Sequence, residues 1–187
     1  SPIHIRNLTP LKNTYTKAYF FDRGQVLEYR KNGIAAEYLP LAADVETFSS
    51  IVVSEQERKE YRSEISLVGQ LYQTVYPQYA APLDAYEKGY LEGIMAAQKM
   101  VYGGYFLPDF LTDDLIRKMN AAYQKAWNGN IAVNKREVEF LLASEITRRE
   151  RFEVLSLLSN HFDVALYSSD SDTLLNKLRQ KFYVDIR

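Results

Sequence analysis

The sequence predicts an α/β fold, built from Rossmann-like pieces of parallel sheet with a large helical segment, from three observations. The first 40 residues contain a strand–helix–strand pattern with short joints. Two later apolar runs, at residues 64–68 and 163–168, have the β-branched and aliphatic character of buried strands. Between them, residues 80–160 carry apolar side chains three and four positions apart, which is the spacing of helices that pack against a core.

The start of the chain is expected to form a βαβ unit. Residues 16–22 give the first strand, a helix follows at 23–31, and residues 36–39 give the second strand. Gly33 can take the left-handed conformation that ends a helix. Because the joints are short and the crossover is helical, the two strands should be parallel. Asp22, at the end of the first strand, either caps the helix or faces a ligand.

A crossing segment leads to the strand at 64–68, which stops abruptly at Gly69. Pro40 keeps the preceding strand from continuing as a helix, and residues 45–62 show no clear apolar period. In open α/β sheets ligands bind outside the carboxyl ends of the strands, so Gly69 and Gln70 are candidate ligand contacts. A glycine directly after a strand also forms a plain tight turn, and this alternative stays open.

Three long helices are predicted inside the helical segment. The first covers residues 83–102, and the second covers 112–127 and opens with a capping hydroxyl at Thr112. The longest covers 134–160 and begins with Asn134 and a glutamate three residues later, which is a capping-box pair. Apolar stripes of this kind are typical of a core rather than of a cofactor site.

The longest helix carries an unusual placement of charge. At about 100° per residue, Glu145 and Arg149 fall inside its apolar arc. Arg148 and Arg151 fall outside that arc. Four positions apart in the favourable order, Glu145 and Arg149 can form an ion pair at a helix crossing. The alternative is that Arg149 reaches a phosphate, because guanidinium offers a fork of donors suited to it.

The strand at 163–168 ends in hydroxyl side chains. Ser168 and Ser169 precede acidic and hydroxyl residues that would cap a helix at 173–180, and residues 182–186 supply a last strand. Hydroxyls between the end of a strand and the start of a helix are suited to phosphate, ribose or base contacts. Ser168 and Ser169 are therefore candidate ligand contacts, although helix capping explains the residues after them equally well.

Charge and composition disfavour several classes of function. Lys and Arg total 23 against 24 Asp and Glu, so no global field attracts nucleic acid or an anionic membrane. The absence of cysteine removes thiolate zinc sites and disulfides, and two histidines make a histidine metal site or a Ser-His-acid triad a poor expectation. With no bilayer-length run and no signal-peptide pattern, we expect a cytoplasmic protein without nucleic-acid partners, membrane span or bound metal.

Six segments, in order, resemble a bacterial family of glycosyltransferase-like proteins related to the spore maturation protein CgeB. They are YFFDR (19–23), YLPLAAD (38–44), ISLVGQLY (65–72), GYLEGIM (89–95), TRRER (147–151) and HFDVALYS (161–168). The resemblance implies a GT-B arrangement, in which two Rossmann-like domains face each other across a cleft and the second holds a nucleotide-sugar donor. It would place Gly69 opposite the donor, and Ser168 and Ser169 near the nucleotide.

The resemblance also implies the class of chemistry and its partners. The nucleotide-sugar donor would transfer its sugar to an acceptor that the sequence does not identify. No cofactor and no catalytic metal would be needed, because helix dipoles and basic side chains can stabilise the departing diphosphate.

Under this resemblance the chain divides into three parts. Residues 1–44 would be the C-terminal part of a first Rossmann-like domain, and residues 45–62 the interdomain crossing. Residues 63–187 would be the N-terminal part of the second domain, with the helical insertion at 80–160. Family members are longer at both ends, and the chain begins at Ser1 without a methionine. We therefore expect an internal fragment of a glycosyltransferase, inactive alone because its catalytic residues lie elsewhere.

A non-catalytic protein-interaction module is the alternative function. In that case the helical segment would present contiguous exposed apolar surface to another protein. The side chains concerned are Tyr86, Tyr90, Met95 and Tyr102. A nucleotide-sensing or response-regulator-like domain is a weaker third interpretation, because it requires an acidic cluster at the strand ends and Asp22 stands alone there.

Overall fold

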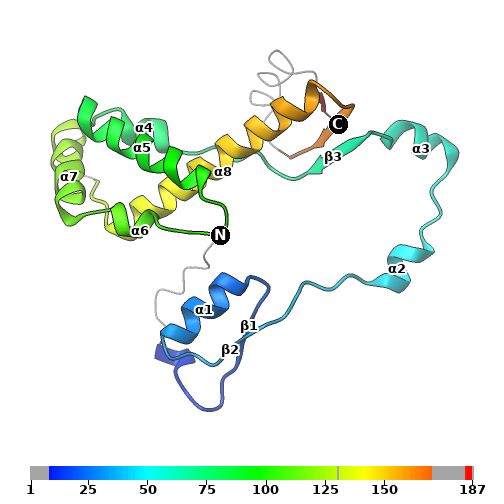
Figure 1. Ribbon diagram of the computed structural model, residues 1–187, viewed down its shortest axis with the longest axis horizontal. Helices are drawn as coiled ribbons and strands as arrows, with labels where there is room; N and C mark the ends of the chain where they lie inside the picture. Colours follow the sequence, from blue (N-terminus) through cyan, green and yellow to red (C-terminus); the bar gives the residue numbers. More distant parts are fainter. Residues whose placement is uncertain (1–8, 130, 170–183, 187) are drawn as a thin grey trace. The chain divides into compact units, whose positions relative to one another are not determined.

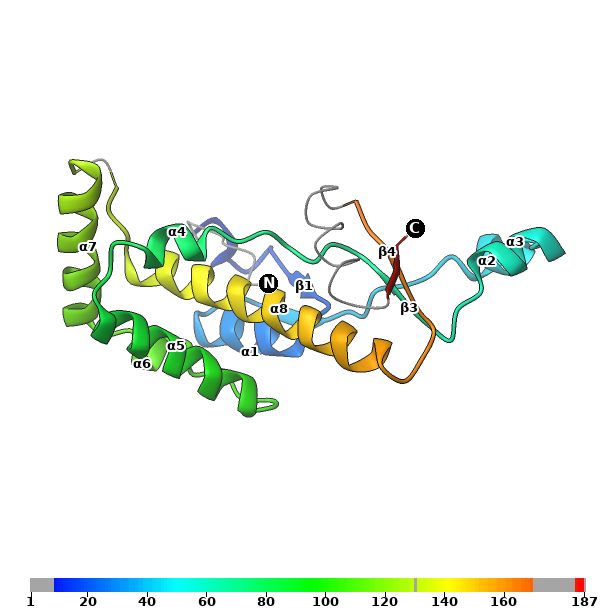
Figure 2. The same ribbon diagram turned by 90° about the horizontal axis from the view of Figure 1, so that it is seen from above.

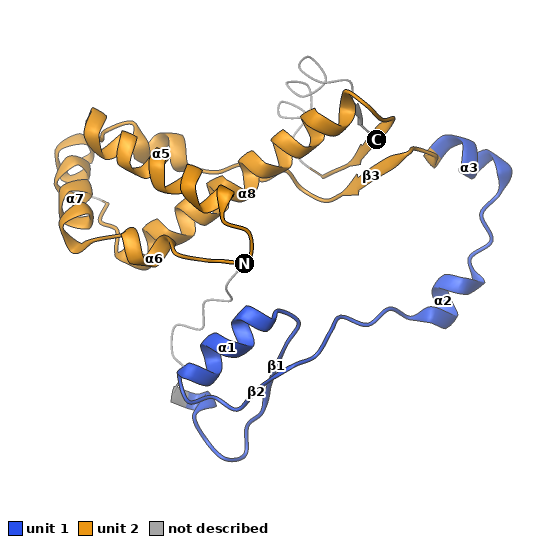
Figure 3. Cartoon of the chain, viewed as in Figure 1, with its two compact units in different colours: residues 1–60 blue, residues 61–187 orange. Residues whose placement is uncertain are grey.

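The computed structural model describes residues 9–129, 131–169 and 184–186. The fold is mixed α/β and divides into two compact units, residues 1–60 and 61–187 (Figure 3). The first elements are η1 (Thr9–Leu11), β1 (Ala18–Phe20), α1 (Arg23–Lys31), β2 (Ala36–Tyr38), α2 (Val45–Ser50) and α3 (Glu55–Tyr61). Then come β3 (Ile65–Val68), α4 (Tyr76–Ala80), α5 (Ala85–Met100), α6 (Leu107–Phe110), α7 (Asp113–Trp127), α8 (Lys135–Ser159), β4 (Val164–Tyr167) and β5 (Val184–Ile186) (Figure 1).

The first unit contains the predicted βαβ arrangement. β1 and β2 are parallel, with Phe20 opposite Tyr38, and α1 connects them. The rings of Phe20 and Tyr29 stack with their centroids 4.4 Å apart, which packs α1 onto the sheet. The carboxylate of Asp22 accepts a hydrogen bond from the amide of Gln25 at 2.8 Å. Of the two interpretations of Asp22, the structure therefore shows helix capping.

The short helices α2 and α3 contain no buried residue. α2 begins at Asp44, whose carboxylate accepts a hydrogen bond from the amide of Thr47 at 3.0 Å. At the start of α3, the amide of Ser54 donates to the carboxylate of Glu57 at 2.7 Å. Local caps rather than tertiary packing therefore stabilise these helices, in agreement with the lack of an apolar period in this stretch of the sequence.

The second unit contains a three-stranded parallel sheet in the order β3-β4-β5. Its register places Ile65 opposite Val164 and Val68 opposite Tyr167. The central strand, β4, buries its first three residues. Parallel strands need a long crossover, and the helices from α4 to α8 supply it between β3 and β4. The helix predicted at 173–180 lies outside the described residues.

The longest helix, α8, connects the helical part of this unit to its sheet. At 1.5 Å per residue it is about 37 Å long. Its first half packs among α4, α5 and α6, and its C-terminal end lies beside β4 (Figures 1 and 2). Capping boxes at Asp84 and Asn134 begin α5 and α8, while Thr112 caps α7. The predicted starts of α7 and α8 are confirmed.

The helical part of the second unit encloses its larger core. The fully buried side chains at its centre are Met95, Leu107, Leu111, Met119, Tyr123, Val138 and Leu142. A smaller core beneath the sheet contains Leu71, Leu155, Val164 and Leu166. None of the helices in the described ranges combines the length and the apolar composition that a bilayer crossing requires.

Candidate functional site

The carboxyl ends of β3 and β4 bring four of the predicted ligand contacts together. The amide of Gly69 donates to the carbonyl of Tyr167 at 2.9 Å, which extends the ladder between the two strands. The side-chain amide of Gln70 donates to the hydroxyl of Ser169 at 3.1 Å. Gly69, Gln70, Ser168 and Ser169 therefore lie at one edge of one parallel sheet, the placement that a shared ligand site requires.

The backbone at the end of β3 requires a glycine. Gly69 has a φ of +150°, a conformation that side chains rarely adopt. A Cβ at this position would lie 3.5 Å from a guanidinium nitrogen of Arg151. The tight turn alone accounts for the glycine, so a ligand role for this edge depends on the residues around it.

Arg151 completes the group at this edge, although it is not among the ligand contacts predicted from the sequence. Its guanidinium donates to the carbonyl of Gln70 and lies over the ring of Tyr72, 4.5 Å from the ring centroid. Among the described residues, no carboxylate forms an ion pair with Arg151. Arg148 and Arg149, on the same helix, are both paired with carboxylates. The sheet edge therefore carries a positive charge that these residues do not neutralise.

A signal for Arg151 is present in the sequence. Leu155, four residues later, is buried in the core beneath the sheet. Because positions i and i+4 share a helix face, Arg151 lies on the side of α8 that faces the sheet. The apolar arc used for the prediction came from residues 138–146, which face the other helices, and so it left Arg151 outside.

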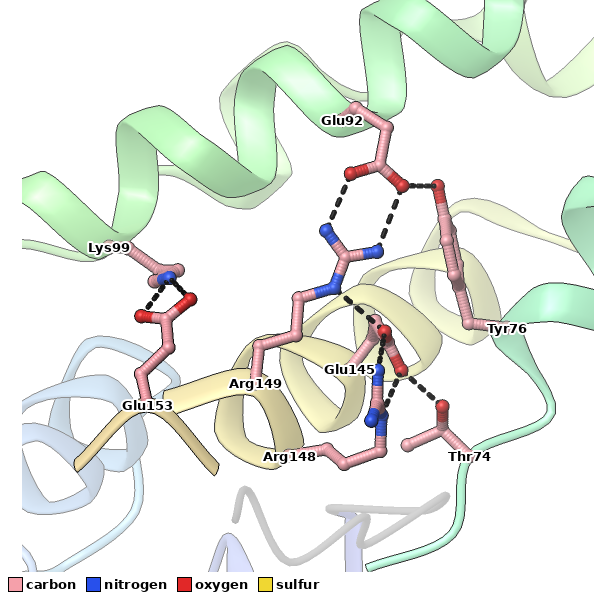
Figure 4. A network of polar contacts seen from close by, with 8 residues as sticks. All are labelled: Thr74, Tyr76, Glu92, Lys99, Glu145, Arg148, Arg149 and Glu153. Carbon is pink, nitrogen blue, oxygen red and sulfur yellow. Dashed lines mark hydrogen bonds and ion pairs between the residues drawn. The ribbon is translucent and has the colours of Figure 1, made fainter. Parts of the chain in front are cut away.

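Arg149 does not join the sheet edge. Its two terminal nitrogens donate to the carboxylate of Glu92 on α5 at 2.5 and 2.9 Å (Figure 4). Its Nε donates to the carboxylate of Glu145 at 2.7 Å. Every guanidinium nitrogen thus faces a carboxylate, which is the ion pair at a helix crossing that one interpretation predicted. The interpretation of Arg149 as a phosphate contact is corrected accordingly.

Glu145 is the centre of this ionic network. Its side chain is 1% exposed, and it accepts hydrogen bonds from Arg148, Arg149 and the hydroxyl of Thr74. Burial raises the pKa of the Glu145 carboxyl, but the hydrogen bonds from these three residues outweigh burial and lower the pKa to about 2. Glu145 is therefore a buried anion at neutral pH.

The network extends to α4, and a separate ion pair links the C-terminal part of α5 to α8. Tyr76, the first residue of α4, donates its hydroxyl to Glu92 at 2.8 Å. The hydrogen bonds from Arg149 hold the pKa of the Glu92 carboxyl below its usual value. Lys99 of α5 forms an ion pair with Glu153 of α8 at 2.5 Å (Figure 4). The network thus connects α8 both to α5 and to the chain segment that follows β3.

The apolar face expected of an interaction module is interrupted. Met95 is fully buried, and Tyr90 is half-buried with its hydroxyl donating to the carbonyl of Phe110 at 2.8 Å. Tyr86 and Tyr102 are exposed. The four side chains therefore do not form one exposed stripe, and the middle of the stripe belongs to the core.

The surface hollows and the possible metal ligands of the described residues give no further functional assignment. Two surface hollows on the helices are lined by residues between 75 and 131, none of them at the sheet edge. In the described part of the chain, no group of three or more His, Asp or Glu side chains is placed to hold a metal ion.

A scan against protein-family models and searches of curated proteins and of solved structures found no match to this chain. The resemblance to the CgeB-related family stays a prediction from the sequence.

Proposed function

We propose that the carboxyl edge of β3 and β4 binds the diphosphate of a nucleotide-sugar donor, as part of a GT-B type glycosyltransferase. The observation that carries this proposal is the guanidinium of Arg151, which has no carboxylate partner among the described residues and lies beside Gly69. A guanidinium fork matches phosphate oxygens in geometry and charge. Strand-end loops of a parallel sheet are, in addition, the usual place for a nucleotide in this class of fold.

The polar side chains beside Arg151 would complete the donor site. The amide of Gln70 and the hydroxyl of Ser169 bind each other at 3.1 Å and are both exposed, so a ligand can replace this mutual bond. Their donors suit phosphate oxygens or a ribose hydroxyl. The site in this chain therefore holds and orients the donor, and we assign no catalytic residue within it.

The chemistry of glycosyl transfer explains why a cation belongs at this edge. The bond between the anomeric carbon of the sugar and a diphosphate oxygen breaks, and the bonding electrons leave with the nucleoside diphosphate. The acceptor hydroxyl forms the new bond to the anomeric carbon and releases its proton to water. A positive charge fixed near the diphosphate stabilises the charge that grows on it. Arg151 would provide this charge.

Replacing Arg151 with glutamine is expected to weaken donor binding by about tenfold to a hundredfold, the usual contribution of a hydrogen-bonded ion pair. Isothermal titration calorimetry with UDP-, GDP- and ADP-sugars measures the Kd of the wild type and the variant. Glutamine keeps a polar side chain at this position but carries no charge, so the variant tests the charged guanidinium.

Arg117→Gln is the matched control for this experiment. Arg117 is an exposed arginine of α7 whose ion pair is with Asp114 of the same helix. Its replacement should leave donor affinity unchanged. Equal affinities of the wild type and Arg151→Gln would contradict the proposal, as would a wild type that binds none of the three donors.

A further inference from the structure

We infer that Thr74 is a positioning residue for the sheet-edge site, because its bond to Glu145 holds the segment that carries Gln70. The identity of the ligand rests on the proposed function. The contacts that support the role of Thr74 all lie inside the second unit. Thr74 touches no proposed ligand group and acts through the backbone between itself and Gln70.

Hydrogen bonds near each of its ends connect the segment that follows β3 to α8, in addition to the packing of Leu71 against Leu155. The carbonyl of Gln70 accepts a hydrogen bond from Arg151, and the hydroxyl of Thr74 donates one to Glu145. Thr74, the later residue of the segment, contacts Glu145, the earlier residue of the helix, so the two stretches run in opposite directions. Six residues of α-helix rise about 9 Å, whereas four residues of extended chain reach about 13 Å. The segment can therefore span the distance between the two hydrogen bonds without being fully extended.

Tyr72 lies in the sequence between Gln70 and Thr74, the two residues that these hydrogen bonds hold. Its φ of +60° is in the left-handed region, which is uncommon for a residue with a side chain. Leu71 beside it is fully buried in the core with Leu155. A backbone conformation of this kind persists where the surrounding contacts determine it. The bond between Thr74 and Glu145 is one of those contacts.

Glu145 keeps its place without Thr74 because two arginines also bind it. Arg148 donates to its two oxygens at 2.9 and 2.6 Å, and Arg149 donates to it at 2.7 Å (Figure 4). If the hydroxyl of Thr74 is removed, Glu145 remains paired and no buried charge is left without a partner. The loss then falls on the segment, which can relax at Tyr72 and carry the carbonyl of Gln70 away from Arg151.

A pair of variants at one position tests this role in the full 187-residue chain. Thr74→Val removes the hydroxyl at nearly constant volume, and Thr74→Ser keeps it. Without ligand, we expect Thr74→Val to shift the backbone amide NMR signals of Gly69, Gln70 and Tyr72. With pyrophosphate as the probe, we expect Thr74→Val to bind roughly tenfold more weakly than the wild type. Thr74→Ser should restore both the signals and the affinity.

The two measurements separate the positioning role from the proposed function. If the amide signals shift in Thr74→Val and return in Thr74→Ser, but the wild type does not bind pyrophosphate, the positioning role is supported and the phosphate site is contradicted. Signals and affinity that stay at wild-type values in Thr74→Val would overturn the inference. A Thr74→Ser variant that behaves like Thr74→Val would overturn it too, as would a general loss of the spectrum in Thr74→Val, since a global effect on folding is not positioning.

Discussion

Replacing Arg149 with methionine is expected to lower the free energy of unfolding by about 2–3 kcal/mol. Arg149 binds Glu92 with two nitrogens and Glu145 with the third. Without it, the buried Glu145 loses one of its two cations, and the crossing of α5 over α8 loses one of the two ion pairs that the described residues form there, leaving that between Lys99 and Glu153. The expected loss is below that of a fully buried pair because the side chain of Glu92 is 45% exposed. Urea denaturation monitored by circular dichroism measures the change.

Arg117→Met is the matched control for this loss. Arg117 and Asp114 form an ion pair on the surface of α7, with 75% and 52% of their side chains exposed. Exposed pairs contribute little, so this variant should stay within about 0.5 kcal/mol of the wild type. If Arg117→Met and Arg149→Met lowered the free energy of unfolding equally, the ionic network between α5 and α8 would stabilise the fold no more than a surface ion pair does.

Acidification from pH 5 to pH 2 is expected to remove on the order of 3 kcal/mol of stability through Glu145 alone. The pKa of its carboxyl falls from 4.5 to about 2 in the folded chain. Because the folded pKa is the lower one, the unfolded chain takes up the proton first as the pH falls. The stabilisation is therefore fully present above pH 4.5 and decreases as the pH approaches the folded pKa.

The Glu145→Gln variant isolates this contribution. Glutamine cannot titrate, so its free energy of unfolding should depend less steeply on pH between 5 and 2 than that of the wild type. In the middle of this range, the slopes of the two curves of unfolding free energy against pH should differ by the equivalent of about one bound proton. Other carboxyls will keep part of the slope in both proteins. Parallel curves for the wild type and Glu145→Gln would contradict the assignment of Glu145 as a buried, ion-paired anion.

Local features of the fold could be predicted because their causes are local in the sequence. The caps at Asp22, Thr112 and Asn134 are side chains that bind backbone amides three residues away, and each begins a helix as predicted. The parallel pairing of β3 with β4 could also be anticipated, since apolar strands joined by a long helical crossover run the same way. This pairing placed Gly69 and Ser169 at one edge.

The choice between arginines could not be made from periodicity. One helix contributes to two cores: Leu142 is buried among the helices, and Leu155 is buried beneath the sheet. A single apolar arc describes only the first of these, so it favoured Arg149, which binds carboxylates, over Arg151, which reaches the sheet edge. The apolar stripe of α5 shows the same effect. The spacing of its residues predicts a shared helix face, but it does not predict that Met95 on this face is buried. Only tertiary packing decides such cases.

A titration followed by ¹H–¹⁵N NMR is the most direct test of the donor site. The full chain is titrated with a UDP-, a GDP- and an ADP-sugar in turn, and the signals of the sheet edge are followed. With one of these donors, we expect saturable shifts of the backbone amides of Gly69, Gln70, Ser168 and Ser169 and of the Nε–H of Arg151. Shifts confined to the helices α4 to α7, or no shift with any donor, would contradict a nucleotide-sugar site at this edge.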